Sequence, residues 1–311
     1  MSTPQGRLLE EDRNLDIKVV RDEDMILLNR KTRSIKYPYV LGARLRAGLG
    51  KPSYSMGLGD CIFLDFSRGL FAIADSPERN SVASRRFMLK VAQMLENSIF
   101  DISGHIYTKK EMNKIKNNLA GKSQELLKSI PSNESCTFTG LFIAKTDYGM
   151  KGIVFHTGDS LLIRCDLAAG EADQLTENNF WMVGKVSRFF QVDYVEISDE
   201  TRFLLTTDGF SDLRPPEGVD RKEFILSLFN RYNVEEIPDA ILEKHDSGHG
   251  YKDDIGLISF NPNKISFDGK RIIMGGTESQ DEKLFRERQR QGFYEDAYIP
   301  LVLKEDLFIV S

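Results

Sequence analysis

The sequence has few cysteines and no long apolar run, and each absence excludes a class of protein. Three cysteines occur among 311 residues with no Cys-x-x-Cys pair, which excludes a disulfide-rich scaffold and predicts a reducing compartment. No apolar stretch approaches the roughly 18–20 residues that span a bilayer. The start, MSTPQGRLLEEDRN, lacks the apolar core of a signal peptide. We therefore expect a soluble, cytoplasmic protein with no membrane partner.

An excess of positive charge is also missing. The chain has 42 Lys and Arg against 47 Asp and Glu, a net charge of −5 at pH 7. A generic nucleic-acid binder normally shows a basic face, so we expect no nucleic-acid partner. Hydrophobic residues make up 41% and charged residues 29%, which is ordinary globular usage and argues against disorder.

Short apolar runs alternate with turn residues along the chain. Two strands are predicted within 15–30, followed by a glycine-rich connection from Gly42 to Gly59. Strands, then helices, then strands and helices again indicate an α+β fold with antiparallel sheet covered by helices. Further strands are predicted at 61–66, 70–75, 136–146, 151–157, 161–167, 202–207, 255–260 and 267–274, and helices at 83–95, 112–130, 220–231, 234–244 and 279–293.

Four aspartates stand where apolar strands begin or end. Carboxylates at the rim of a sheet repel one another unless a cation lies between them. Carboxylate and water oxygens are ligands that suit Mg²⁺ or Mn²⁺. Taken singly, each aspartate is better explained as a turn residue, and it is their joint order that favours a metal site. The four are Asp60, Asp75, Asp208 and Asp253.

The order of five segments resembles the metal-dependent protein phosphatases, the protein phosphatase 2C-like family. The segments are GDCIF, LFAIADS, FHTGDSLLIRCD, FLLTTDGFSD and KDDIGLISF, and the TDG and GDS segments are the specific ones. The resemblance implies an α+β fold, an antiparallel β-sandwich flanked by helices on both faces. It also implies hydrolysis of phosphoserine or phosphothreonine on a phosphorylated protein substrate in signal transduction, by water activated between two Mn²⁺ or Mg²⁺ ions.

The resemblance also assigns the metal ligands. Asp75 would bridge the two metals, and Asp208 and Asp253 would complete the first metal. Asp60 would serve the second metal, directly or through water. The backbone carbonyl of Ser76 would stand where the family uses a glycine carbonyl, which is tolerable because the ligand is main chain.

A third, weaker metal is held in some relatives at positions that match Asp159 and Asp212. Turn and helix-cap roles explain these two aspartates at least as well. The chain also departs from the family's pattern: Asp254 replaces an asparagine, and the segment from Ser76 to Asn80 lacks the family's glycines. No arginine lies a few residues before Asp60 to hold phosphate.

Gly59 also precedes Asp60 where some relatives carry a second acid, and this Gly-Asp form and the absent arginine resemble the bacterial regulatory branch of the family, which dephosphorylates anti-sigma-factor antagonists. The departures bear on the efficiency and substrate preference of catalysis and leave the predicted metal ligands in place. They leave open a second function, a catalytically weak phosphatase-like module that binds a partner or ligand and signals by conformation. A titration with manganese and a phosphomonoester substrate separates the two functions.

Other candidate residues are weaker. A core role is expected for His156, and solvated loop positions are expected for His245 and His249. The guanidinium groups that follow Asp75 could bind phosphate, but a basic, solvated start to a helix explains them better. They belong to Arg79, Arg85 and Arg86.

Cys61 is not a tyrosine-phosphatase nucleophile, because Ser67 stands where the C-x5-R cradle needs arginine.

The resemblance covers roughly 55–260 and divides the chain into three parts. Residues 1–50 are expected to supply strands and a connection that pack on the core, and residues 51–261 the catalytic domain. Residues 262–311 are expected to form an extension packed on that core, because burying each of their apolar side chains contributes about 1.5–3 kcal/mol.

Overall fold

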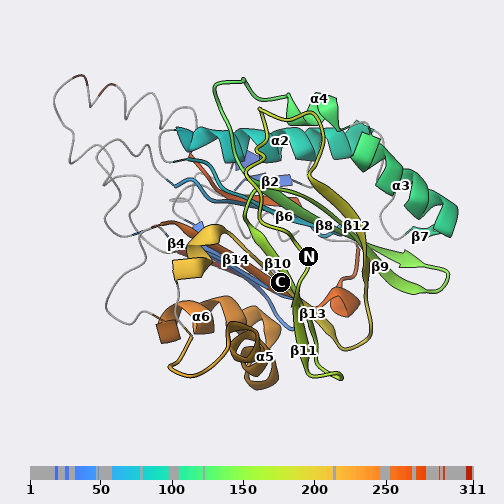
Figure 1. Cartoon of the computed structure of the whole chain (residues 1–311), viewed down its shortest axis with the longest axis vertical. Coiled ribbons are helices and arrows are strands. Elements are labelled where there is room, and N and C mark those ends of the chain that lie inside the picture. Colours follow the sequence, from blue (N-terminus) through green and yellow to red (C-terminus); the bar gives the residue numbers. More distant parts are fainter. Residues whose placement is uncertain are drawn as a thin grey trace, which may run out of the picture.

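Apolar strands and amphipathic helices stack in four layers, with two sheets face to face and helices on both outer faces (Figure 1). The structure is a computed structural model of the chain. It describes residues 18–19, 25–27, 32–46, 48, 58–77, 80–97, 105–121, 123–212, 215–245, 253–267, 271–277, 287, 290 and 306–309.

The first sheet has nine strands among the described residues. Its central strands β5, β6 and β8 are buried along nearly their whole length, which fits their continuous apolar sequence. The order is β1 (Lys18–Val19), β2 (Met25–Leu27), β15 (Arg271–Gly275), β5 (Cys61–Asp65), β6 (Leu70–Ala74), β8 (Phe138–Thr146), β9 (Gly149–Thr157) and β12 (Gln191–Glu196), with β7 (Ile106–Tyr107) also beside β8.

The second sheet has seven strands among the described residues. Both sheets are mainly antiparallel; the parallel pairs are β7 with β8, β15 with β2 and β16 with β3. The order is β11 (Glu171–Gln174), β10 (Leu161–Asp166), β13 (Thr201–Thr206), β14 (Ile255–Phe260), β4 (Leu41–Arg46), β3 (Thr32–Tyr37) and β16 (Asp306–Ile309).

Helices cover the outer face of each sheet. The apolar stripe of α2 (Val82–Asn97) packs on the first sheet beside α3 (Lys109–Gly121) and α4 (Gln124–Leu127). The second sheet is covered by α5 (Arg221–Arg231) and α6 (Ile237–His245). Short 3₁₀ turns follow or precede these elements: η2 (Asp208–Asp212), η3 (Val234–Glu236) and η4 (Pro262–Lys264).

Three apolar cores result, one between the sheets and one under each helix layer. The predicted α+β sandwich flanked by helices is therefore confirmed. No helix in the described part of the chain is long and apolar enough to cross a membrane.

The glycine-rich connection predicted from Gly42 was wrong at its start. Residues 41–46 form β4, a strand inside the second sheet, paired with β14 and β3. Gly42 is there because of packing: a Cβ would lie 2.4 Å from the backbone oxygen of Glu235. The predicted helix at 112–130 is also interrupted, since α3 ends at Gly121 and α4 begins at Gln124.

Several strands and one helix show the limits of the sequence pattern. The strands β3, β7, β11, β12 and β16 were not predicted; β12 is an edge strand with polar, half-exposed residues and therefore a weak apolar signal. The helix predicted at 279–293 lies outside the described residues, apart from isolated positions 287 and 290. Whether 51–261 is a domain separate from its two extensions stays a prediction.

The strand registers bring the ends of both sheets together. In the first sheet Cys61 pairs with Ala74, and in the second Thr206 pairs with Leu161 and Leu257. Each of these residues is next to or near a predicted metal ligand in sequence. Because neighbouring strands are antiparallel, the start of one and the end of the next meet at one end of the sandwich.

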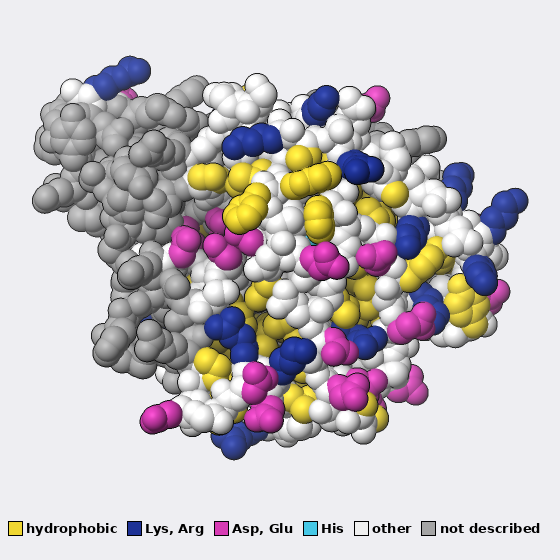
Figure 2. Space-filling view, viewed as in Figure 1, with side chains coloured by type: hydrophobic (Ala, Val, Ile, Leu, Met, Phe, Trp, Pro, Cys, Tyr) yellow, Lys and Arg dark blue, Asp and Glu magenta, His cyan; other side chains and the backbone are white. Residues whose placement is uncertain are grey.

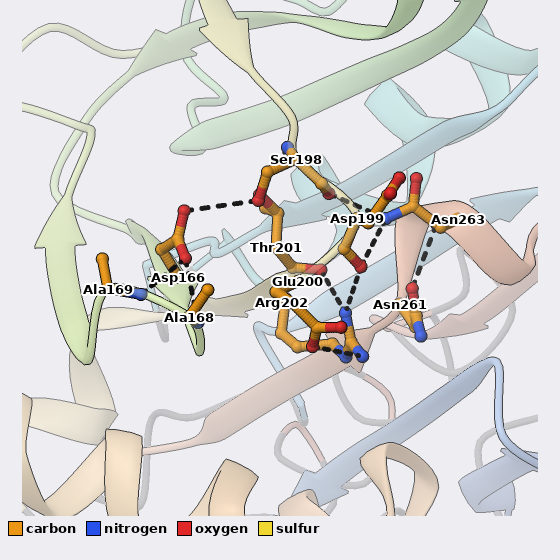
Figure 3. A network of polar contacts seen from close by, with 10 residues as sticks. All are labelled: Asp166, Ala168, Ala169, Ser198, Asp199, Glu200, Thr201, Arg202, Asn261 and Asn263. Atoms are coloured by element: carbon orange, nitrogen blue, oxygen red, sulfur yellow. Dashed lines mark hydrogen bonds and ion pairs between the residues drawn. The ribbon is translucent and has the colours of Figure 1, made fainter.

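Hydrogen bonds stabilise the end of the second sheet that lies away from the predicted metal ligands (Figure 3). The Ser198 backbone N–H donates to Thr201 Oγ1 (2.8 Å), and the Asn263 side chain donates to the carbonyls of Ser198 (2.8 Å) and Asp199 (3.0 Å). Asn263 follows β14 and Thr201 begins β13. These contacts fix the two strands relative to each other, and hence the loops at their other ends.

Candidate functional site

The predicted ligands lie where the strands of both sheets end at one edge of the sandwich. Asp60 directly precedes β5, and Asp75 directly follows β6. In the second sheet the ligands come from the loops that flank β13 and β14. We call Asp60, Asp75, Asp208 and Asp253 the aspartate cluster.

Asp60 is the most deeply placed member, with 1% of its surface exposed. Its Oδ2 accepts a hydrogen bond from the Thr207 hydroxyl (2.8 Å), and its backbone oxygen accepts one from the Gly276 N–H (2.7 Å). No described N–H or O–H group donates to its buried Oδ1. A buried carboxylate oxygen without a donor costs free energy, so this atom is poised for a ligand.

The carboxyl groups of the cluster interact electrostatically. Burial raises the pKa of Asp60 well above 3.8, and the charges of Asp75 and Asp254 raise it further. Burial likewise raises the pKa of Asp75, with added repulsion from Asp208 and Asp253. Without a cation, these carboxyl groups therefore hold protons more tightly than free carboxyl groups do.

Gly59 leaves space where two predicted ligand oxygens meet. A Cβ at Gly59 would lie 2.3 Å from the Ser76 backbone oxygen and 2.9 Å from Asp75 Oδ1. Any larger residue would fill this small space. The position of the Ser76 carbonyl is fixed from the other side, because Ser76 Oγ accepts the backbone N–H of Ser84 in α2 (2.6 Å).

Asp254 holds the loop that carries Asp60. Its Oδ1 accepts the Gly48 N–H (2.9 Å) and its Oδ2 accepts the Gly59 N–H (2.7 Å), from segments about 200 residues away in sequence. Its own backbone N–H donates to Asp253 Oδ1 (2.8 Å). Both side-chain oxygens are acceptors, which explains an aspartate where the family has asparagine, since an amide offers only one oxygen.

The two predicted third-metal residues differ in what the structure describes. Asp159 lies in the turn between β9 and β10 and is half-buried. Burial raises its pKa, and the charge of Asp253 raises it further. Asp212 ends η2, and its side chain lies outside the described part of the structure.

The donor set fits a hard divalent ion. It consists of carboxylate and carbonyl oxygens, includes an oxygen of Asp60 without a donor, and leaves space beside Gly59. Within the described residues, no three His, Cys, Asp or Glu side chains are close enough to hold an ion as they stand. Binding therefore requires the carboxylates to draw together, which a cation favours by cancelling their repulsion.

The arginine and histidine candidates have other partners. Arg85 is buried, not on a solvated face as predicted, and donates to the Gly275 carbonyl (2.6 Å). Arg86 forms an ion pair with Glu134. The side chain of His245, and both Arg79 and His249 entirely, lie outside the described residues.

His156 is a core residue, in agreement with its prediction. Its Nδ1 contacts the Thr139 hydroxyl (2.8 Å), and its Nε2 contacts the Glu177 carbonyl (3.1 Å). Burial lowers its pKa to about 4. Hydroxyl contacts continue from here toward Asp75, because Thr137 Oγ1 bonds both Ser160 Oγ (2.9 Å) and the Asp75 N–H (3.1 Å).

Thr207 was missed by sequence reasoning. Its hydroxyl donates to Asp60 and accepts the Gly256 N–H (2.9 Å), so it links the two sheets at the cluster. Its place directly before the Asp-Gly pair of TTDG is the one signal that could have found it, since a hydroxyl there is next to a predicted ligand.

Comparison with known proteins identifies the fold. A bacterial serine phosphatase bearing an arginine-to-alanine mutation superposes with a TM-score of 0.54 at 15% identity, covering 71% of this chain and 96% of that one. The PPM Ser-Thr phosphatase MsPP from Mycobacterium smegmatis, in complex with cacodylate, gives 0.50 at 15% identity, covering 72% and 99%. No family model and no curated protein matches the sequence. The predicted resemblance is confirmed: the chain has the fold of the PPM serine/threonine phosphatases.

Proposed function

We propose that the chain is a metal-dependent phosphatase that hydrolyses phosphoserine or phosphothreonine on protein substrates. The observation that carries this proposal is the aspartate cluster itself, in which desolvation and the repulsion between carboxyl groups raise the pKa of Asp60 and Asp75. The fold of serine/threonine phosphatases, including one in complex with the oxyanion cacodylate, supports the reaction class.

Each predicted ligand would have its own role in metal binding. Asp75 and the Ser76 carbonyl would hold an ion beside Gly59, with Asp208 and Asp253 completing that site. Asp60, oriented by the Thr207 hydroxyl, would hold a second ion. Bound Mn²⁺ or Mg²⁺ would activate a water for attack on phosphorus and neutralise the phosphoryl oxygens. Further roles in a third site are proposed for Asp159 and Asp212.

The alternative is a catalytically weak phosphatase-like module that binds a partner or ligand and signals by conformation. It is favoured by the arginines of the first turn of α2, since Arg85 binds the Gly275 carbonyl and Arg86 binds Glu134. Location in the cytoplasm belongs to the same proposal and is supported by three buried, free cysteines.

One experiment tests the proposed function. The purified full chain is titrated with MnCl₂ and with MgCl₂ against p-nitrophenyl phosphate and a phosphoserine peptide. We expect saturable activation by the metal and complete loss of activity in EDTA. Hydrolysis that is unaffected by EDTA would exclude the two-metal mechanism, and metal binding without hydrolysis would favour the weak module.

A further inference from the structure

The segment 175–190, between β11 and β12, leaves three aromatic side chains in solvent. Phe180 is fully exposed (102%), and Trp181 and Phe190 are 36% and 39% exposed. The rings of Trp181 and Phe190 pack edge to face with centroids 5.5 Å apart, and the Arg188 guanidinium lies 5.8 Å over the Trp181 ring. We call this pair, together with Phe180, which adjoins Trp181 in sequence, the aromatic patch. Apolar groups gathered on a surface indicate an interaction site.

The segment that carries the aromatic patch is held in place by buried side chains and by backbone hydrogen bonds. Val183 and Phe189 of the same segment are buried under the helix layer of the first sheet. The Val183 N–H donates to the Cys136 carbonyl (2.9 Å), and the Gly184 N–H donates to the Leu127 carbonyl (2.8 Å). The segment therefore has places for apolar side chains in the core, and the patch residues are held outside it.

The patch is joined directly to the candidate site. Asn179 Oδ1 accepts the N–H groups of Gly158 (2.9 Å) and Trp181 (3.0 Å), and the Asn179 N–H donates to the Gly158 carbonyl (2.8 Å). Gly158 lies against Thr137, since a Cβ at Gly158 would be 2.5 Å from the Thr137 Cβ, and the Thr137 N–H donates to the Asp75 carbonyl (2.7 Å). Figure 2 shows hydrophobic side chains gathered next to a group of acidic side chains on this face of the molecule.

We propose that the aromatic patch binds an apolar side chain that lies a few residues from the phosphorylated residue of the protein substrate. The proposal rests on the proposed function and names the substrate class for that site. A phosphoresidue at the aspartate cluster fixes the neighbouring peptide, which advances about 3.3 Å per residue when extended. The side chains of the peptide that flank the phosphoresidue then lie over the segment that Asn179 links to Gly158 by hydrogen bonds. Arg188 adds a cation beside the rings, which complements the negative charge of a phosphopeptide.

The test compares two phosphoserine peptides that are identical except for their flanking residues, leucine in one and serine in the other. With Mn²⁺, we expect the wild-type chain to show a kcat/KM at least about tenfold higher for the leucine peptide, about 1.4 kcal/mol. Phe180→Ala should abolish this preference while leaving p-nitrophenyl phosphate hydrolysis unchanged. Tyr148→Ala is the matched control: Tyr148 is 51% exposed at the opposite end of β9 and should keep the preference.

Failure of this proposal is separable from failure of the proposed function. Trp181 is the one tryptophan of the chain, so its emission reports peptide binding without turnover. If the wild type hydrolyses nothing but binds the leucine peptide about tenfold more tightly, the patch assignment stands. Equal binding and turnover of both peptides would overturn it. So would concentration-dependent self-association that Phe180→Ala abolishes, because a second copy would then cover the patch.

Discussion

Two polar regions, one buried and one partly buried, lie at the same end of the sandwich and differ in how their polar groups are satisfied. In the hydroxyl–histidine network, formed by Thr137, Thr139, His156 and Ser160, described donors meet described acceptors. In the aspartate cluster, carboxyl groups face one another and Asp60 Oδ1 receives no hydrogen from a described group. The comparison separates polar groups that support the fold from polar groups that we propose bind metal.

The two regions also have opposite dependences on pH. The raised pKa of Asp60 and Asp75 means that the metal-free folded state binds protons more tightly than the unfolded chain, so this contribution to stability is lost as pH rises. The lowered pKa of His156 has the reverse effect, and its contribution is lost as pH falls. Changes in each region should therefore be distinguishable by pH as well as by activity.

The largest expected effect comes from Asp75→Asn. Removing a charge that binds the cations should lower kcat with Mn²⁺ by about 100- to 1,000-fold or more, as for lost transition-state stabilisation elsewhere. In EDTA at pH 7 the variant should be as stable as the wild type or more stable, because a repulsive charge is gone. Phosphatase assays and thermal melts measure the two effects.

Asp166→Ala is the control for this variant, because it removes the oxygen that accepts two backbone hydrogen bonds. Asp166 ends β10 at the opposite end of the sandwich, where its Oδ1 accepts the N–H groups of Ala168 (3.1 Å) and Ala169 (3.0 Å) (Figure 3). It should lose stability and keep activity. If Asp75→Asn behaved in the same way, Asp75 would be a structural residue and the comparison would fail.

The next effect concerns His156→Gln. The wild-type contribution of His156 is fully present above pH 6.5 and is lost as pH falls toward about 4, because the unfolded chain takes up a proton that the folded chain rejects. The difference between these values corresponds to about 3 kcal/mol. The uncharged glutamine should flatten the fall in unfolding free energy across this range, measured by urea denaturation. An unchanged pH slope would show that His156 is not the titrating group.

The four aspartates could be singled out from the sequence because each lies beside an apolar strand. An apolar run shows both that a strand is buried and where it ends. The sequence pattern failed at β4 and β12. Gly42 reads as a loop residue, although it is required by the approach of the Glu235 backbone. In β12 the alternation is weak because an edge strand buries little; Val195 is its one fully buried side chain.

Roles that depend on distant contacts were not predictable. Asp254 was identified only as a departure from a motif, since its partners Gly48 and Gly59 lie about 200 residues earlier. Arg85 was assigned to a solvated helix face, whereas tertiary packing buries it against Gly275. Local patterns indicate where a strand ends, but they do not indicate which backbone groups meet there.

A moderate effect is expected for Asp254→Asn. The amide keeps one acceptor oxygen and turns an NH₂ group toward the second backbone N–H, so one buried donor loses its partner. Unfolding free energy should fall by about 1–3 kcal/mol, and half-activation should need more Mn²⁺ because the loop carrying Asp60 loosens. Asp173→Asn, which removes a half-exposed ion pair with Arg164 (3.0 Å), is the control and should change neither quantity measurably. Equal behaviour of the two variants would contradict the bracing role of Asp254.

The smallest effect is expected for Cys61→Ala, although Cys61 adjoins Asp60 in sequence. Its thiol donates weakly to the Gly275 carbonyl (3.7 Å) and lies in the apolar core under α2. Burial raises its pKa to about 12, so almost no thiolate exists at neutral pH and the sulfur is neither a nucleophile nor a metal ligand. The variant should keep phosphatase activity with Mn²⁺ and lose about 1 kcal/mol of stability through lost packing. Iodoacetamide at pH 8 should leave Cys61 of the folded wild type unmodified, as read by mass spectrometry, and modify it in urea. Rapid modification of the folded chain with loss of activity would place the thiol in the site and reopen the cysteine mechanism that Ser67 argues against.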